Sequence, residues 1–97
     1  MLAAEAAARV TRDGEALRFA GALVREAVPA LWRQALPLLD GVRRLELGDV
    51  ARVDSAGVAL LAELAARAGG VAVDGAPQGL PELRAAYRLA PSLAFAH

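Results

Sequence analysis

An acid and a hydroxyl stand next to each other at Asp54 and Ser55. Two small residues, Ala56 and Gly57, follow them and lead into an apolar run from Val58. This pattern is typical of a helix N-terminus, where unpaired backbone N–H groups and a partial positive charge favour an accepting side chain, with a contribution on the order of 1 kcal/mol. The same groups would also favour a phosphoryl group, so Ser55 is a candidate phosphoacceptor.

The two small residues need a separate explanation. Gly57 costs about 1 kcal/mol relative to alanine in a helix, and Ala56 adds little bulk beside it. We interpret the pair as a surface that is kept small so that something else can approach it closely.

Catalysis is the least supported class of function. A nucleophilic Ser55 would need a base, but the only histidine is His97 and the sequence has no lysine. There is also no cysteine, no cluster of metal ligands and no glycine-rich nucleotide loop. We therefore expect a protein that is not an enzyme and that holds no cofactor or metal.

Length and charge limit the remaining classes. The 97 residues suffice for a single domain over residues 1–97, and 57% of them are hydrophobic, which argues against disorder. The 11 basic and 11 acidic residues balance, so capture of nucleic acid is not expected. Residues 1–10 lack the apolar core of a signal peptide, and no 18-residue stretch is free of charge. We expect a cytoplasmic protein without direct membrane insertion.

The first elements are predicted to be a β-hairpin and a helix. Residues 8–11 and 16–23 flank Asp13-Gly14, which adopts positive φ readily. From Glu26, apolar residues repeat with helical spacing, and Pro37 is expected to end or bend that helix near Leu36. The apolar face consists of Val28, Leu31, Trp32, Ala35, Leu36 and Leu39.

The rest of the chain alternates between strands and helices. Residues 42–50 have period two around Glu46 and predict a strand. A helix follows that is capped at Asp54 or Ser55, has Gly57 in its first turn and stops at Gly69-Gly70. Residues 71–73 predict a short strand, and residues 80–90 predict a last helix that ends at Pro91. This helix is expected to face inward through Leu80, Leu83, Tyr87 and Ala90.

The resulting order, ββαβαβα, predicts an α/β fold. Right-handed crossovers make the strands after the hairpin parallel, in a mixed, mostly parallel, four-stranded sheet that is covered by helices. Trp32 and Tyr87 are expected to pack in the core, because they lie on the apolar faces of their helices. The alternative is a partly exposed ring that serves as an interface anchor. We expect Arg43, Arg44 and Arg52 to be solvated, and the alternative is that they meet an acidic partner.

The residues around Asp54 also carry a family resemblance. The run LELGDVARVDSAGVALL resembles the strand, loop and helix signature of STAS domains, and the element order extends the likeness over nearly the whole chain. The resemblance implies the STAS (anti-sigma-factor-antagonist-like) fold. In the antagonist branch the hydroxyl residue after the aspartate is phosphorylated by a partner kinase, which implies Ser55. However, the second hydroxyl residue of that branch is Ala56 here, and its Gly-Glu-Leu-Asp motif reads GALV at residues 21–24.

The segments DSAGVALL and VPALW, at residues 54–61 and 28–32, are more similar to MlaB-type STAS proteins. These are small subunits of the bacterial Mla phospholipid-transport ABC system, which maintains lipid asymmetry. The resemblance implies an accessory subunit that binds the cytoplasmic ATPase through Asp54, Ser55, Ala56 and Gly57, peripheral to the inner membrane. The alternative is an anti-sigma-factor antagonist, with an anti-sigma factor or kinase as partner, that is switched at Ser55.

Overall fold

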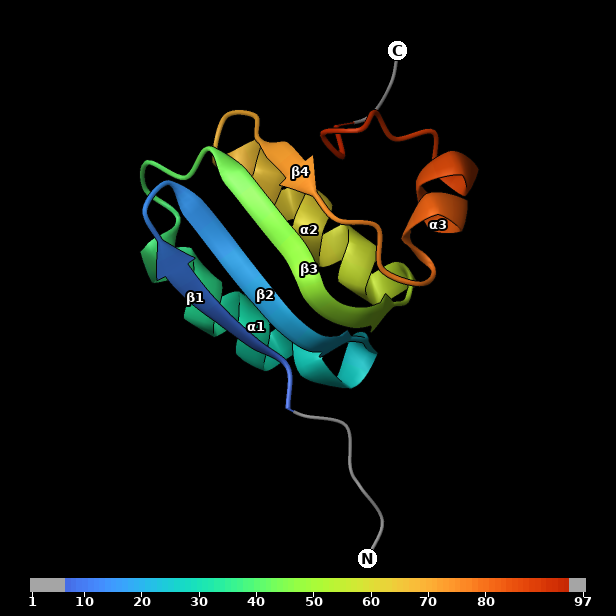
Figure 1. Ribbon diagram of the computed structural model, residues 1–97, viewed down its shortest axis with the longest axis horizontal. Coiled ribbons are helices and arrows are strands. Elements are labelled where there is room, and N and C mark those ends of the chain that lie inside the picture. Colours follow the sequence, from blue (N-terminus) through green and yellow to red (C-terminus); the bar gives the residue numbers. More distant parts are fainter. Residues whose placement is uncertain (1–6, 95–97) are drawn as a thin grey trace, which may run out of the picture.

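A single four-stranded sheet organises the protein. The computed structural model describes residues 7–94, in which the strands lie in the order β1-β2-β3-β4. β1 pairs antiparallel with β2, whereas β3 is parallel to both β2 and β4. The predicted order ββαβαβα and the mixed α/β sheet are confirmed (Figure 1). The strands are β1 (Arg9–Asp13), β2 (Ala16–Leu23), β3 (Arg44–Val53) and β4 (Ala72–Asp74), and the helices are α1 (Val28–Ala35), α2 (Ser55–Arg67) and α3 (Leu80–Ala86).

The two longer helices cover only one face of the sheet. Figure 1 shows α1 behind β1 and β2, and α2 behind β3. Beneath them lies the core, because apolar side chains of the strands alternate toward the helices. The largest fully buried side chains are Phe19, Leu17, Leu23, Leu31, Leu45, Leu47, Leu61, Leu64, Leu93, Val42 and Val58.

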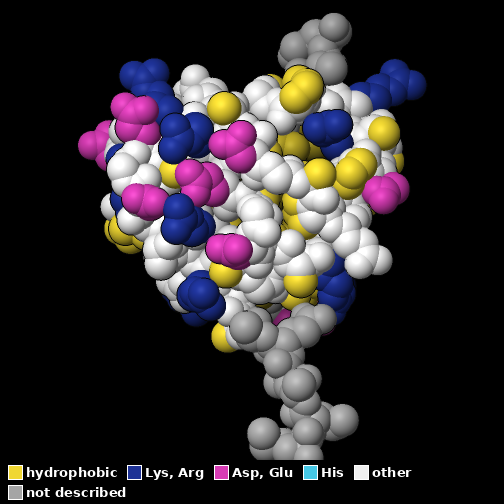
Figure 2. Space-filling view, in the orientation of Figure 1, with side chains coloured by type: hydrophobic (Ala, Val, Ile, Leu, Met, Phe, Trp, Pro, Cys, Tyr) yellow, Lys and Arg dark blue, Asp and Glu magenta, His cyan; other side chains and the backbone are white. Residues whose placement is uncertain are grey.

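The opposite face, which we call the open face, carries charges that pair across the strands. Arg18 on β2 contacts Asp13 on β1 at 2.8 Å and Glu46 on β3 at 3.0 Å. Arg44 contacts Glu46 at 3.3 Å and Asp74 on β4 at 3.9 Å. Figure 2 shows basic and acidic side chains interspersed there. These exposed pairs contribute little individually, but they make the face polar and solvated.

β3 differs from its predicted bounds of residues 42–50, since it begins at Arg44 and continues to Val53. Its register against β2 shifts twice, so that β3 holds one extra residue at each shift. Bulges of this kind interrupt the period of two. Val50 and Val53 are therefore buried at a spacing of three, and the strand delivers Asp54 directly to the start of α2.

The first helix is shorter than predicted and ends as Pro37 indicated. α1 lies between two 3-10 turns, η1 (Arg25–Ala27) and η2 (Leu36–Leu38). The expected bend near Leu36 is thus confirmed. The expected burial of Leu36 is wrong, because this side chain is 36% exposed. The tighter winding of η2 turns it away from the apolar face.

The last helix was predicted to reach Pro91, and this is wrong. α3 ends at Ala86, and two residues later Arg88 has a left-handed φ of 54°. Its N–H donates to the Ala85 carbonyl, and the Leu89 N–H donates to the Arg84 carbonyl. These two bonds form a Schellman motif, which usually has glycine at the left-handed position. Because arginine occupies it here, the sequence carries no stop signal.

The Schellman motif also changes which side chains face inward. Tyr87 is 47% exposed rather than buried, and Ala90 is only half-buried. Leu89, which was not expected in the core, is buried in their place. By contrast Trp32 is half-buried against the core, with the Arg67 guanidinium 5.0 Å from its ring centre. Arg67 also forms an ion pair with Glu63, four residues earlier on α2, at 3.3 Å.

Candidate functional site

Asp54 is the residue that caps α2. Its backbone is extended, and its Oδ1 accepts a hydrogen bond from the Gly57 N–H at 2.9 Å. Its Oδ2 accepts a second one, from the Arg25 N–H, also at 2.9 Å. One carboxylate therefore joins the first turn of α2 to η1. Ser55, the other candidate cap, is exposed, and its hydroxyl makes no hydrogen bond within residues 7–94.

The hydrogen bonds of Asp54 also determine its charge. Burial raises the pKa of its carboxyl, but the N–H groups of Gly57, Arg25 and Ala56, together with the Arg25 charge, outweigh this effect. The pKa consequently lies below the ordinary value of 3.8. Asp54 is thus an anion at neutral pH, and it holds the helix start rather than acting as a proton donor.

Removal of this cap gives a pH-dependent prediction. Asp54→Ala should lower the free energy of unfolding by about 1 kcal/mol at pH 7. Because folding lowers the pKa, the carboxylate stabilises the protein fully above its unfolded pKa, and this is lost as the pH falls through the folded value. The gap between wild type and variant, measured by urea unfolding, should therefore narrow below about pH 4. The control is Asp49→Ala, at an exposed position of β3. If the stability difference between wild type and Asp54→Ala were the same at pH 7 and pH 3, this role of Asp54 would be contradicted.

The packing of α2 against β2 explains why residue 57 is a glycine. Gly57 is buried, and a Cβ there would lie 2.0 Å from the carbonyl oxygen of Leu23. The same oxygen accepts a hydrogen bond from the Asp54 N–H at 3.2 Å. Gly57 therefore lets α2 approach the end of β2, so an open surface is not needed to explain it. Of the four predicted contact residues, Ser55 is exposed, whereas Asp54 and Ala56 are half-buried.

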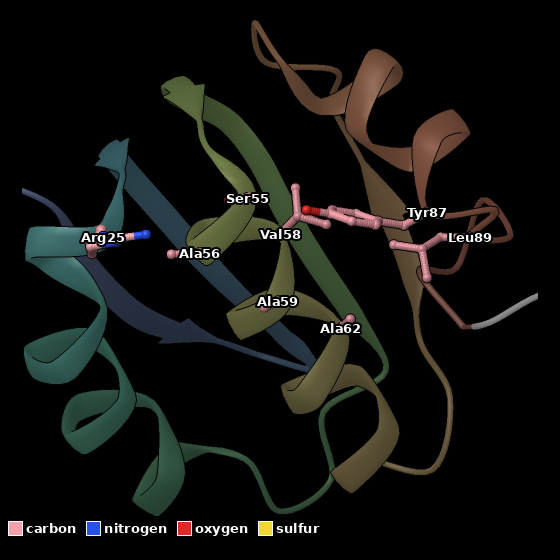
Figure 3. Close-up of a pocket in the computed structure, with 8 residues that line it drawn as sticks. All are labelled: Arg25, Ser55, Ala56, Val58, Ala59, Ala62, Tyr87 and Leu89. Carbon is pink, nitrogen blue, oxygen red and sulfur yellow. The ribbon is translucent and has the colours of Figure 1, made fainter.

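An apolar hollow of about 340 Å³ adjoins Ser55 and Ala56. Its floor is one side of α2, and Figure 3 shows Arg25 on one flank and the Tyr87 ring on the other. The lining residues are Arg25, Ser55, Ala56, Val58, Ala59, Ala62, Tyr87 and Leu89. The site thus brings the helix start together with two segments that are distant in sequence.

Sequence reasoning missed most of this hollow. The only signal was the spacing of alanines along α2, which leaves one side of the helix with short side chains. Nothing local indicated that Arg25 or Leu89 would flank them, because each is placed by tertiary contacts. Within the described part of the chain, no three His, Cys, Asp or Glu side chains come together as a metal site.

The fold and the site together define a class of protein. A sheet with one antiparallel and two parallel pairs, two helices on one face and an Asp-Ser-Ala-Gly start of α2 characterise a STAS domain. A family model described as "Mlab, STAS domain" matches residues 6–93. The chain belongs to this MlaB STAS domain family. A search of curated proteins gave no match to it.

Proposed function

We propose that this chain is a non-enzymatic STAS subunit that binds the cytoplasmic ATPase of an ABC phospholipid transporter and supports its activity, so that the transporter maintains lipid asymmetry. The family match over residues 6–93 supports this choice of partner. The observation that carries the proposal is the start of α2, where exposed Ser55 and half-buried Ala56 border an apolar hollow. Asp54 holds that surface in place from within.

The membrane would be reached through the partner. None of the helices within residues 7–94 is long and apolar enough to cross a bilayer. We place the chain on the cytoplasmic side of the inner membrane because the family match points to an ABC ATPase as its partner. Affinity capture of the tagged chain from detergent-solubilised host membranes, followed by mass spectrometry, should recover an ABC ATPase with its permease.

Ser55 offers a direct test of this contact. Ser55→Glu should weaken binding to the captured ATPase about tenfold, because a close interface would desolvate the new carboxylate. Ser55→Ala should bind like the wild type, and Thr11→Glu on the open face controls for added charge. Affinities are measured by calorimetry with purified ATPase. Equal binding by Ser55→Glu and wild type would contradict the proposal.

A second candidate is a phosphorylation switch at Ser55, as in an anti-sigma-factor antagonist. The exposed, unbonded hydroxyl at the N-terminus of a 13-residue helix, beside Arg25, favours it. It predicts that protein from the native host carries the mass of one phosphate, which Ser55→Ala lacks. It also predicts capture of an anti-sigma factor or kinase. Unmodified protein under all growth conditions would remove this candidate.

A further inference from the structure

The hollow at Ser55 is one end of a longer groove. It shares Ala59 and Ala62 with a second hollow of about 610 Å³, which reaches Gly69-Gly70 and residues 92–94. We call the two together the α2 groove. It follows the 13 residues of α2, a length of roughly 20 Å. Its floor is formed by short side chains, namely Ala56, Ala59, Ala62 and Ala66.

The α2 groove has an arginine without an ion pair at one end. Arg25 flanks the end where α2 begins, and its guanidinium forms no ion pair among the residues that the structure describes. The N-terminus of α2 lies beside it and is capped by the Asp54 carboxylate. Both oxygens of the nearby Asp54 are occupied by backbone N–H groups. Farther along, Glu63 and Arg67 pair with each other at 3.3 Å.

The shape of the groove favours a protein segment over a small molecule. Small-molecule sites usually enclose most of their ligand, whereas both hollows of this groove are partly open to solvent. An amphipathic helix buries only one face in such a groove. The alanine floor permits a close approach between helix axes, near the lower end of the usual 8–10 Å. Exposed Tyr87 and buried Leu89 supply one apolar wall.

We propose that the α2 groove binds an apolar helix of the partner protein, and that an acidic side chain of that helix pairs with Arg25. The Arg25 guanidinium, which makes no ion pair within residues 7–94, favours an acidic side chain there, and the alanine floor favours an apolar face along the rest of the helix. The identity of the partner as the transporter ATPase rests on the proposed function, whereas the chemistry of the bound helix rests on the groove.

Photo-crosslinking in host cells tests the occupant. A photoreactive amino acid at Ala59, in the floor, should capture a partner peptide that is apolar, helical and acidic at one end; the same group at Thr11, on the open face, should not. Capture of the ATPase supports both proposals. Capture of such a helix from another protein supports the groove and removes the proposed function. Capture of a second copy, or of nothing, overturns the groove, even if the ATPase is recovered through another surface.

A charge exchange tests the role of Arg25. Arg25→Glu should weaken binding of the crosslinked partner about tenfold, and a lysine in place of the partner's acidic residue should restore it. Arg25→Lys should retain most of the affinity. Arg43→Glu, an equal change at an exposed arginine near the start of β3, is the control. Circular dichroism verifies that each variant folds. Equal losses for Arg25→Glu and Arg43→Glu, or no recovery by exchange, would overturn the pairing.

Discussion

Gly57→Ala should lower the free energy of unfolding by about 3 kcal/mol. The added Cβ would lie 2.0 Å from the oxygen and 2.9 Å from the carbon of the Leu23 carbonyl. Both are backbone atoms at the end of β2, so relief requires α2 or the strand to move. An alanine in a helix otherwise stabilises by about 1 kcal/mol relative to glycine. A loss of stability, rather than the gain expected for an unhindered helix position, would therefore indicate the contact with Leu23.

Gly48→Ala is the matched control for this substitution. Gly48 lies in β3, and nothing stands within 4 Å of a Cβ built there. Its change in stability should stay within about 0.5 kcal/mol. Urea unfolding can be followed through Trp32, the single tryptophan. A Gly57→Ala protein as stable as the wild type would show that α2 is not seated against the Leu23 carbonyl.

The features that sequence predicted correctly are those set by nearby residues. Capping at the start of α2 depends on Asp54 and an N–H three residues later, so the pattern was visible. The order of strands and helices followed from hydrophobic period, and the parallel pairing followed from the crossovers. Pro37 likewise marked the bend at Leu36 through its own backbone.

The features that sequence missed depend on residues far apart or on exceptions to local rules. The partner of Gly57 is Leu23, 34 residues earlier, and the second partner of Asp54 is the Arg25 N–H, 29 residues earlier. The end of α3 depends on a left-handed arginine, Arg88, where glycine is the usual signal. The candidate contact residues were thus found by pattern, whereas the groove beside them needed the fold.

Two close backbone approaches fix the walls and floor of the α2 groove. The Leu23 carbonyl meets Gly57, which sets α2 against β2. The Val53 carbonyl contacts Gly79, the N-cap residue of α3, and so fixes the helix that Tyr87 follows. Val53 also donates its N–H to the Gln78 carbonyl at 2.9 Å. Since Val53 directly precedes Asp54, the same segment of β3 positions both the start of α2 and the groove wall that Tyr87 forms.

Gly79→Ala should therefore be the most damaging of these substitutions, with a loss of about 4 kcal/mol in the free energy of unfolding. Its φ is 94°, which strains any residue with a Cβ, and that Cβ would lie 2.4 Å from the Val53 oxygen. The two costs add because neither can be relieved by a side-chain rotation. Urea unfolding measures the loss of stability. The affinity of the folded variant for the partner protein shows whether Tyr87 still lines the groove.

Gly70→Ala separates the two costs of Gly79→Ala. Gly70 also has positive φ, 105°, but nothing lies within 4 Å of a Cβ at this position. It should lose only the strain of the left-handed backbone, about 1–2 kcal/mol. An equal loss for Gly79→Ala and Gly70→Ala would mean that the Val53 carbonyl does not press on α3. A larger loss for Gly79→Ala, accompanied by weaker partner binding, would show that this contact holds the Tyr87 wall of the α2 groove in place.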